Sequence, residues 1–240
     1  MPIALDRWLS RPKGIWRGRA LPVLLRMRLR PETRRDMIRL GSDYGGWWIP
    51  SAVLAKNRLA YCAGVGEDMS FDRALLDRGL IVRTFDPTPR AIEYVRQQGL
   101  PTERFSFDPV GWWGEETTLR FYAPENASHV SHSVVNLQNT TSFFEAEVAP
   151  VQRFIDQYGD RDIALVKMDI EGAEHEVIEA LLQTEVRPLV IAVEFDDPQT
   201  TRVVSTTAAL RTAGYQLVKI ERWNYTYAHS ELDRTVGSQA

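Results

Sequence analysis

The sequence has one cysteine and four histidines in 240 residues. Cys62 therefore has no partner for an intramolecular disulfide, and no histidine and cysteine residues have the spacing of a zinc site. No apolar run is long enough to span a membrane, and the N-terminus lacks the apolar core of a signal peptide. These absences lead us to expect a cytoplasmic protein without structural zinc.

The charge is distributed unevenly along the chain. The net charge is -3, yet residues 1–40 contain eleven Lys and Arg against three Asp and Glu. Apolar residues alternate with arginines there, and prolines interrupt the pattern, which predicts short amphipathic helices. We expect residues 1–43 to form a basic helical arm or cap. Such an arm is either a packed cap with solvated arginines or a basic surface for an anionic substrate, a partner or peripheral membrane contact.

The remaining residues, 44–240, have the length and composition of one soluble domain. Apolar strands and amphipathic helices alternate there, which predicts an α/β fold with a mostly parallel sheet, helices on both faces and right-handed crossovers. The expected strands are 58–63, 80–85, 105–107, 118–122, 163–168, 189–194, 215–221 and 224–228. The expected helices are 69–79, 90–98, about 144–158, 173–182 and 201–213.

A glycine-containing turn follows the first of these strands. Gly64 and Gly66 allow a tight turn and close approach of a ligand to the backbone at the start of a helix. Asp86 ends the next strand, where an acidic side chain accepts hydrogen bonds from ribose hydroxyls. The pattern fits a dinucleotide or S-adenosylmethionine. Met69 replaces the third glycine of a dinucleotide site, and the acidic pair Glu67-Asp68 would repel a pyrophosphate, which argues against a nicotinamide oxidoreductase.

Three segments make the chain similar to the FkbM-type methyltransferases: 64–72 (GVGEDMSFD), 85–89 (FDPTP) and, most specifically, 166–174 (VKMDIEGAE). The resemblance covers about residues 44–228. It implies a Rossmann-like class I methyltransferase fold, S-adenosylmethionine as cofactor, and O-methylation of a hydroxyl on a sugar, glycolipid or natural-product small molecule. We expect the cofactor to be bound by Ala63, Gly64, Gly66, Glu67, Asp68, Asp86, Pro87, Asp108, Val110, Gly111 and Asp169.

Asp108, Val110 and Gly111 of that set follow the third strand, where class I folds receive adenine. Residues 110–114 (VGWWG) offer backbone amides and flat rings, and Asp108 has an acceptor for the exocyclic amine. Paired tryptophans serve equally well in core or lid packing.

Methyl transfer to a hydroxyl requires alignment and a base. Asp169 and Glu171 follow a strand at the edge where parallel sheets bind ligands, and we expect both to be catalytic. Glu174 fits either this site or an acidic helix start, and Lys167 fits a buried salt bridge that holds the loop. His132, in a polar loop, is a further candidate base. A last group of carboxylates comes at the end of the following strand: Glu194, Asp196 and Asp197. Together with Asp169 they leave binding of Mg²⁺ or of a sugar open, although a metal is not favoured.

Two alternatives remain open. Ala60 and Cys62 stand where class I methyltransferases usually have an acid and a glycine, which allows a Rossmann domain that binds a nucleotide-like ligand without methyl transfer. The basic arm allows a nucleic-acid methyltransferase, a reading that the acidic core disfavours. No pattern in the sequence indicates an oligomeric state.

Overall fold

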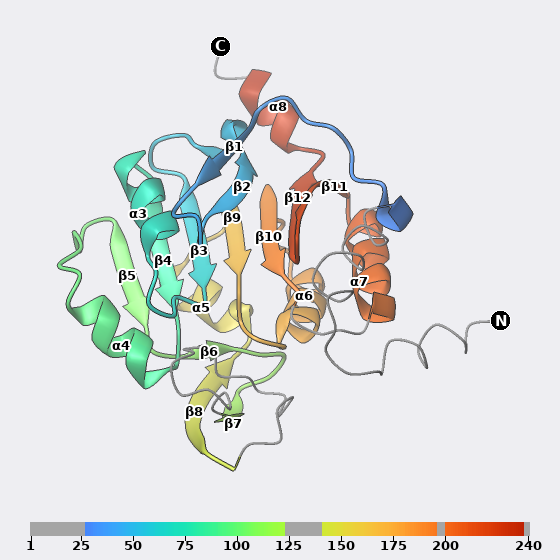
Figure 1. Cartoon of the computed structure of the whole chain (residues 1–240). Coiled ribbons are helices and arrows are strands. Elements are labelled where there is room, and N and C mark those ends of the chain that lie inside the picture. The colour runs from blue at the N-terminus through green and yellow to red at the C-terminus, as the bar shows by residue number, and fades with distance from the viewer. Residues whose placement is uncertain (1–26, 123–140, 196–199, 238–240) are drawn as a thin grey trace.

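The computed structural model describes residues 27–122, 141–195 and 200–237 (Figure 1). Its central sheet has seven strands in the order β5-β4-β3-β9-β10-β12-β11. Strand β12 runs antiparallel to β10 and β11, and the other neighbouring strands of this sheet are parallel. The predicted Rossmann-like α/β fold is therefore confirmed. The strands are β3 (Leu59–Ala63), β4 (Ile81–Phe85), β5 (Phe105–Asp108), β9 (Ile163–Met168), β10 (Val190–Glu194), β11 (Tyr215–Glu221) and β12 (Asn224–His229).

Both faces of this sheet are covered because successive side chains of a buried strand point in opposite directions. In β3, Tyr61 and Ala63 pack in one core cluster, whereas Ala60 and Cys62 pack in another. The first cluster includes side chains of α5, α6 and α7, and the second includes side chains of α3 and α8. The helices are α3 (Ser70–Asp77), α4 (Pro89–Arg96), α5 (Val151–Tyr158), α6 (Glu174–Gln183), α7 (Thr200–Thr212) and α8 (Leu232–Gly237).

A β-hairpin shares the second face with α3. Strand β1 (Met37–Leu40) pairs with β2 (Trp47–Pro50), and the short 3-10 helix η1 (Ser51–Val53) follows. Trp47 is buried among the side chains of α3 and the sheet. The predicted boundary between arm and domain, after residue 43, falls in the turn of this hairpin.

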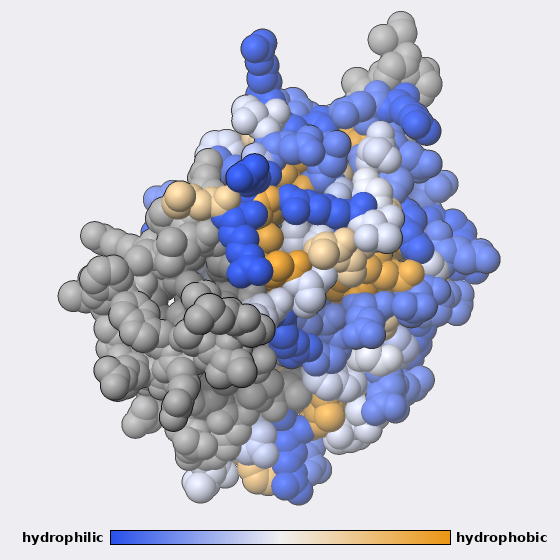
Figure 2. Space-filling model, turned by 90° about the vertical axis from the view of Figure 1, so that its right-hand side faces the viewer, coloured by the Kyte–Doolittle hydropathy of each residue, from blue (hydrophilic) through white to orange (hydrophobic). Residues whose placement is uncertain are grey.

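Residues 29–32 of the predicted arm lie beside β11, whereas residues 37–40 form strand β1, so the prediction of a helical arm is wrong there. Leu29 is buried in the first core cluster, and the backbone amide of Glu32 donates to the Leu217 carbonyl at 2.7 Å. Figure 2 shows hydrophobic residues interspersed among hydrophilic ones on one side of the molecule. Residues 1–26 lie outside the described residues. Within the described ranges no helix is long and apolar enough to cross a membrane.

A second sheet of three strands lies at the end of the central sheet toward which β3, β4, β9 and β10 point (Figure 1). It consists of β6 (Gly111–Trp112), β7 (Thr117–Tyr122) and β8 (Phe143–Ala149). The prediction of a helix from about residue 144 is wrong up to residue 149, where β8 pairs with β7. Pro150 disfavours helical backbone at the residue before it, so α5 begins only at Val151.

Candidate functional site

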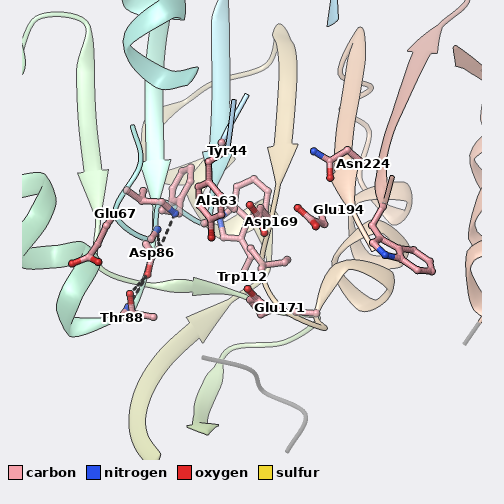
Figure 3. Close-up of a pocket in the computed structure, with 18 of the residues that line it drawn as sticks. Tyr44, Ala63, Glu67, Asp86, Thr88, Trp112, Asp169, Glu171, Glu194 and Asn224 are labelled. Atoms are coloured by element: carbon pink, nitrogen blue, oxygen red, sulfur yellow. Dashed lines mark hydrogen bonds between the residues drawn. The ribbon is translucent and has the colours of Figure 1, made fainter. Parts of the chain in front are cut away.

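A cavity of about 780 Å³ opens at the carboxyl edge of the parallel strands, the place where open α/β sheets bind ligands (Figure 3). The loops after β3, β4 and β9 form it together with the end of β10, the second sheet and two hairpin turns. The lining residues that come from the predicted site are Ala63, Gly64, Gly66, Glu67, Asp86, Pro87, Gly111, Asp169 and Glu171.

The glycine turn is held tightly against the loop after β9. Gly64 has a φ of +82°, and a Cβ built on it would lie 1.7 Å from the carbonyl oxygen of Asp169. Lys167 is buried, and its Nζ donates to the carbonyl oxygens of Ala63, at 3.2 Å, and of Gly64. Lys167, for which the sequence predicts a structural role, thus anchors the turn that the glycines allow.

Asp86 links the turns after β3 and β4. One carboxylate oxygen accepts hydrogen bonds from the backbone amides of Val65, at 2.8 Å, and Gly66, at 3.1 Å. The other accepts from the Thr88 amide, at 2.8 Å, and the Thr88 hydroxyl, at 2.6 Å. The side chain is buried at the cavity wall. Four internal donors thus occupy the oxygens that the sequence predicts to bind ribose hydroxyls. Ribose binding by Asp86 stays a prediction.

Three residues of the predicted cofactor set do not line the cavity. Asp68 accepts hydrogen bonds from the Ser42 hydroxyl and the Ser70 amide, and these lower its pKa although desolvation opposes the effect. Asp108 accepts from the Tyr158 hydroxyl at 2.5 Å. The third, Val110, is partly buried against the first core cluster. Their roles as cofactor ligands stay predictions.

Aromatic and small residues line the side of the cavity next to β6. Trp112 is buried, and the centroid of its ring lies 5.0 Å from the centroid of the Phe85 ring. A Cβ on Gly111 would meet Pro87 and Val148 at 3.0 Å, so this position has no room for a side chain. This wall offers flat, apolar surface beside the glycine turn.

Carboxylates gather on the opposite side of the cavity, after β9 and β10. Asp169 and Glu194 come from neighbouring strand ends because Met168 pairs with Val193 in parallel register. The Glu194 carboxylate points toward Asp169 (Figure 3). Desolvation, together with the negative charges of Asp169 and Glu171, raises the pKa of Glu194 to about 7. Glu171 has a φ of +56°, an unusual backbone conformation for this residue type.

Glu174 lies behind this group, at the start of α6. Its side chain is fully buried, and one oxygen accepts from the Gly172 amide at 2.8 Å. Burial is the main cause that raises its pKa to about 8, and the charges of Asp169 and Glu171 add to it. Glu174 does not line the cavity, and its carboxyl group therefore acts behind the loop that carries Asp169 and Glu171.

Several lining residues were not in the predicted site. The sequence predicts Glu194 only as a metal or sugar ligand, although it stands at a strand end, as Asp169 does. Tyr44, Trp223 and Asn224 reach the cavity through hairpin turns, for which the sequence gives no site signal. Outside the described residues lie the predicted base and two carboxylates, His132, Asp196 and Asp197. In the ranges that the structure describes, no three His, Cys, Asp or Glu residues are arranged to hold a metal ion.

Residues 50–225 match the sequence profile of the methyltransferase FkbM domain, which spans the cavity-forming loops from β2 to β12. The chain belongs to the FkbM methyltransferase family. The resemblance inferred from the three segments is thereby confirmed. No curated protein matches the sequence.

Solved structures give a weaker likeness to members of other methyltransferase groups. An rRNA methylase from Streptococcus thermophilus has a TM-score of 0.43 and 14% identity, over 74% of this chain and 88% of that chain. The fibrillarin pre-rRNA processing protein of Methanococcus jannaschii has a TM-score of 0.43 and 9% identity, over 81% and 83%. Precorrin-6y C5,15-methyltransferase from Geobacter metallireducens has a TM-score of 0.42 and 12% identity, over 83% and 95%. At these values the likeness assigns no substrate.

Proposed function

We propose that the protein transfers a methyl group from S-adenosylmethionine to a hydroxyl group of a small, uncharged or cationic molecule such as a sugar, a glycolipid or a natural product. The observation that carries the proposal is the composition of the cavity. A glycine turn and an aromatic wall form one side, and carboxylates form the other. Its volume, about 780 Å³, falls within the range of about 300–1,000 Å³ usual for ligand pockets.

The residues on the first side fit S-adenosylmethionine. The turn at Gly64 and Gly66 presents backbone without side chains, as a ligand in close contact with the main chain requires. Trp112 and Gly111 offer a flat surface for adenine, and Thr88 and Glu67 offer oxygen atoms near the turn. When bound, the cofactor supplies an activated methyl group. The protein contributes alignment and a place for the proton.

The residues on the second side fit a polyhydroxylated acceptor. Glu194 and Asn224, which pair across β10 and β12, present a carboxylate and an amide to the cavity. Trp223 adds an indole ring to the same wall. Carboxylate and amide groups accept and donate hydrogen bonds to hydroxyls, and a flat ring covers the apolar face of a sugar.

The charge of the lining argues against a phosphate-rich acceptor. Seven carboxylates line the cavity, against two arginines, and Arg39 is 3.6 Å from Glu221 and 3.8 Å from Asp43. A surface of this sign attracts the positively charged sulfonium of the cofactor and repels a nucleic-acid backbone. The alternative of a nucleic-acid methyltransferase would have to rely on residues other than these.

Calorimetry and a transfer assay test the proposal. The full chain is titrated with S-adenosylmethionine and S-adenosylhomocysteine, and then incubated with methyl-labelled cofactor and separate pools of methyl glycosides, glycolipids, phenolic compounds and total RNA. We expect both ligands to bind and label to appear in one of the first three pools. Asp86→Asn is the binding control, because it disrupts the turns on the cofactor side.

The outcomes separate the alternatives. If neither ligand produces a heat of binding under any condition tested, the cofactor assignment is wrong, and the proposal is wrong with it. Binding without transfer to any pool would favour the non-methylating Rossmann domain. Label in RNA alone would favour the nucleic-acid methyltransferase.

A further inference from the structure

The carboxylates that line the cavity differ in what surrounds them. Glu67 forms an ion pair with Arg90 at 2.7 Å, and Asp169 lies 3.7 Å from the ammonium group of Lys167. Each of these two carboxylates therefore has a cationic partner within ion-pair distance. In Asp86, four donors already occupy the carboxylate oxygens.

Glu194 has a different environment. Within the part of the chain that the structure describes, its side chain forms no hydrogen bond and no ion pair. It is also the last residue of β10, a strand that is paired on one side with β9 and on the other with β12. Glu171, by contrast, belongs to a loop. A group fixed at the end of a central strand holds its position more accurately than a group on a loop.

We propose that Glu194 is the catalytic base that accepts the proton of the acceptor hydroxyl. This inference rests on the proposed function and names the residue that completes it. Asp169 and Glu171 then supply negative charge near the base. Asn224, opposite Glu194 in the antiparallel register, is placed to orient the acceptor by hydrogen bonding.

The transfer is balanced in atoms and charge. A lone pair of the acceptor oxygen forms the new bond to the methyl carbon, and the bond between that carbon and sulfur breaks with its electron pair remaining on sulfur. The hydroxyl proton passes to a carboxylate oxygen of Glu194. A sulfonium cation and a carboxylate anion are replaced by a neutral thioether and a neutral carboxylic acid.

The electrostatics of the pocket agree with this role. Desolvation and the negative charges of Asp169 and Glu171 favour the protonated form of Glu194, whereas Lys167 and Arg222 oppose it. The result is a pKa of about 7, and a base works best when its pKa is near the working pH. Above that pH the ionised Glu194 should also attract the sulfonium of S-adenosylmethionine.

This attraction gives a test that needs no acceptor. Affinities for S-adenosylmethionine and S-adenosylhomocysteine are measured by calorimetry between pH 5.5 and 8.5 for the wild type, Glu194→Gln and the exposed control Glu185→Gln. The two ligands share the same amino-acid tail, so its titration cancels in their ratio. For the wild type and the control we expect the preference for the sulfonium ligand to rise about five- to tenfold as the pH passes 7. For Glu194→Gln we expect a preference that does not change with pH.

A second test uses the acceptor pool that takes up label. With that pool, Glu194→Gln should lower kcat about 10²- to 10⁴-fold, and Glu194→Asp should retain part of the activity. Circular dichroism and urea unfolding verify that each variant is folded. If the wild type transfers methyl groups and Glu194→Gln keeps both its rate and its pH-dependent ligand preference, the base assignment is wrong and the proposed function stands. If the wild type binds neither ligand, both are wrong.

Discussion

The Cα of Gly64 lies so close to the carbonyl oxygen of Asp169 that any side chain would occupy the same space. An ideal Cβ on Gly64 would be 1.7 Å from that oxygen. The backbone of Gly64 belongs to the turn beside the proposed cofactor site, and the backbone of Asp169 begins the loop of acidic residues. Their contact therefore fixes the distance between the two sides of the cavity.

Gly64→Ala tests this contact. The alanine would have both a left-handed backbone and a clash with Asp169, so we expect a loss of about 3 kcal/mol or more in the free energy of unfolding. Gly159→Ala is a matched control, because Gly159 has a φ of +69° with no atom within 4 Å of an added Cβ. It should lose only about 1–2 kcal/mol. Equal losses in urea unfolding would show that the contact is unimportant.

Asp86→Asn tests the link between the turns after β3 and β4. An asparagine replaces one oxygen that accepts two hydrogen bonds by an amide group that cannot accept any. We expect a loss of about 2–4 kcal/mol in stability and a drop of at least about tenfold in affinity for S-adenosylhomocysteine. Thr88→Val removes one donor to Asp86 and the hydroxyl that caps α4 by accepting from the Ala91 amide, and it should lose about 1–2 kcal/mol. Unchanged ligand affinity in a folded Asp86→Asn protein would contradict the prediction.

Lys167→Met tests the anchor beneath the glycine turn. The buried ammonium group donates to the carbonyls of Ala63 and Gly64 and faces Asp169, so its removal leaves three oxygen atoms without this partner. We expect stability to fall by about 3–5 kcal/mol. Lys167→Arg should not restore it, because a planar guanidinium group has a different shape from an ammonium group. Chemical denaturation of all three proteins provides the comparison.

Glu174 predicts a pH dependence of stability. Because its pKa rises from 4.5 in the unfolded chain to about 8 in the folded protein, the folded state binds the proton more tightly. The stabilising effect of this proton is complete below pH 4.5 and is lost as the pH rises to 8. Glu174→Gln lacks the titration. Its stability relative to the wild type should therefore increase between pH 4.5 and 8.5, by on the order of 4 kcal/mol.

The raised pKa of Glu194 also makes stability depend on pH, in the same direction in the wild type and in Glu174→Gln. The difference between wild type and Glu174→Gln removes that contribution. Urea unfolding at four pH values measures it. A difference that stays constant across the range would mean that Glu174 is ionised in the folded protein at neutral pH.

Much of the fold could be predicted because local chemistry agreed with the tertiary arrangement. Buried strands such as β3 and β9 read as short apolar runs, and Gly64 and Asp86 marked the turns that follow two neighbouring strands. The region of residues 144–149 could not be assigned in the same way. Its alternation of exposed and half-buried residues becomes a strand only because β7 is available to pair with it.

The strands of the central sheet, the glycine turn, the family and the acidic segment after β9 follow from the sequence alone, because each depends on neighbouring residues or a short motif. Tertiary packing is needed to bring particular carboxylates into one cavity and to set what surrounds each of them. Asn224 lies opposite Glu194 although thirty positions separate them, since an antiparallel hairpin returns β12 to β10. Ion pairs and burial, which distinguish Asp169 from Glu194, likewise depend on residues that the chain brings together only when it folds.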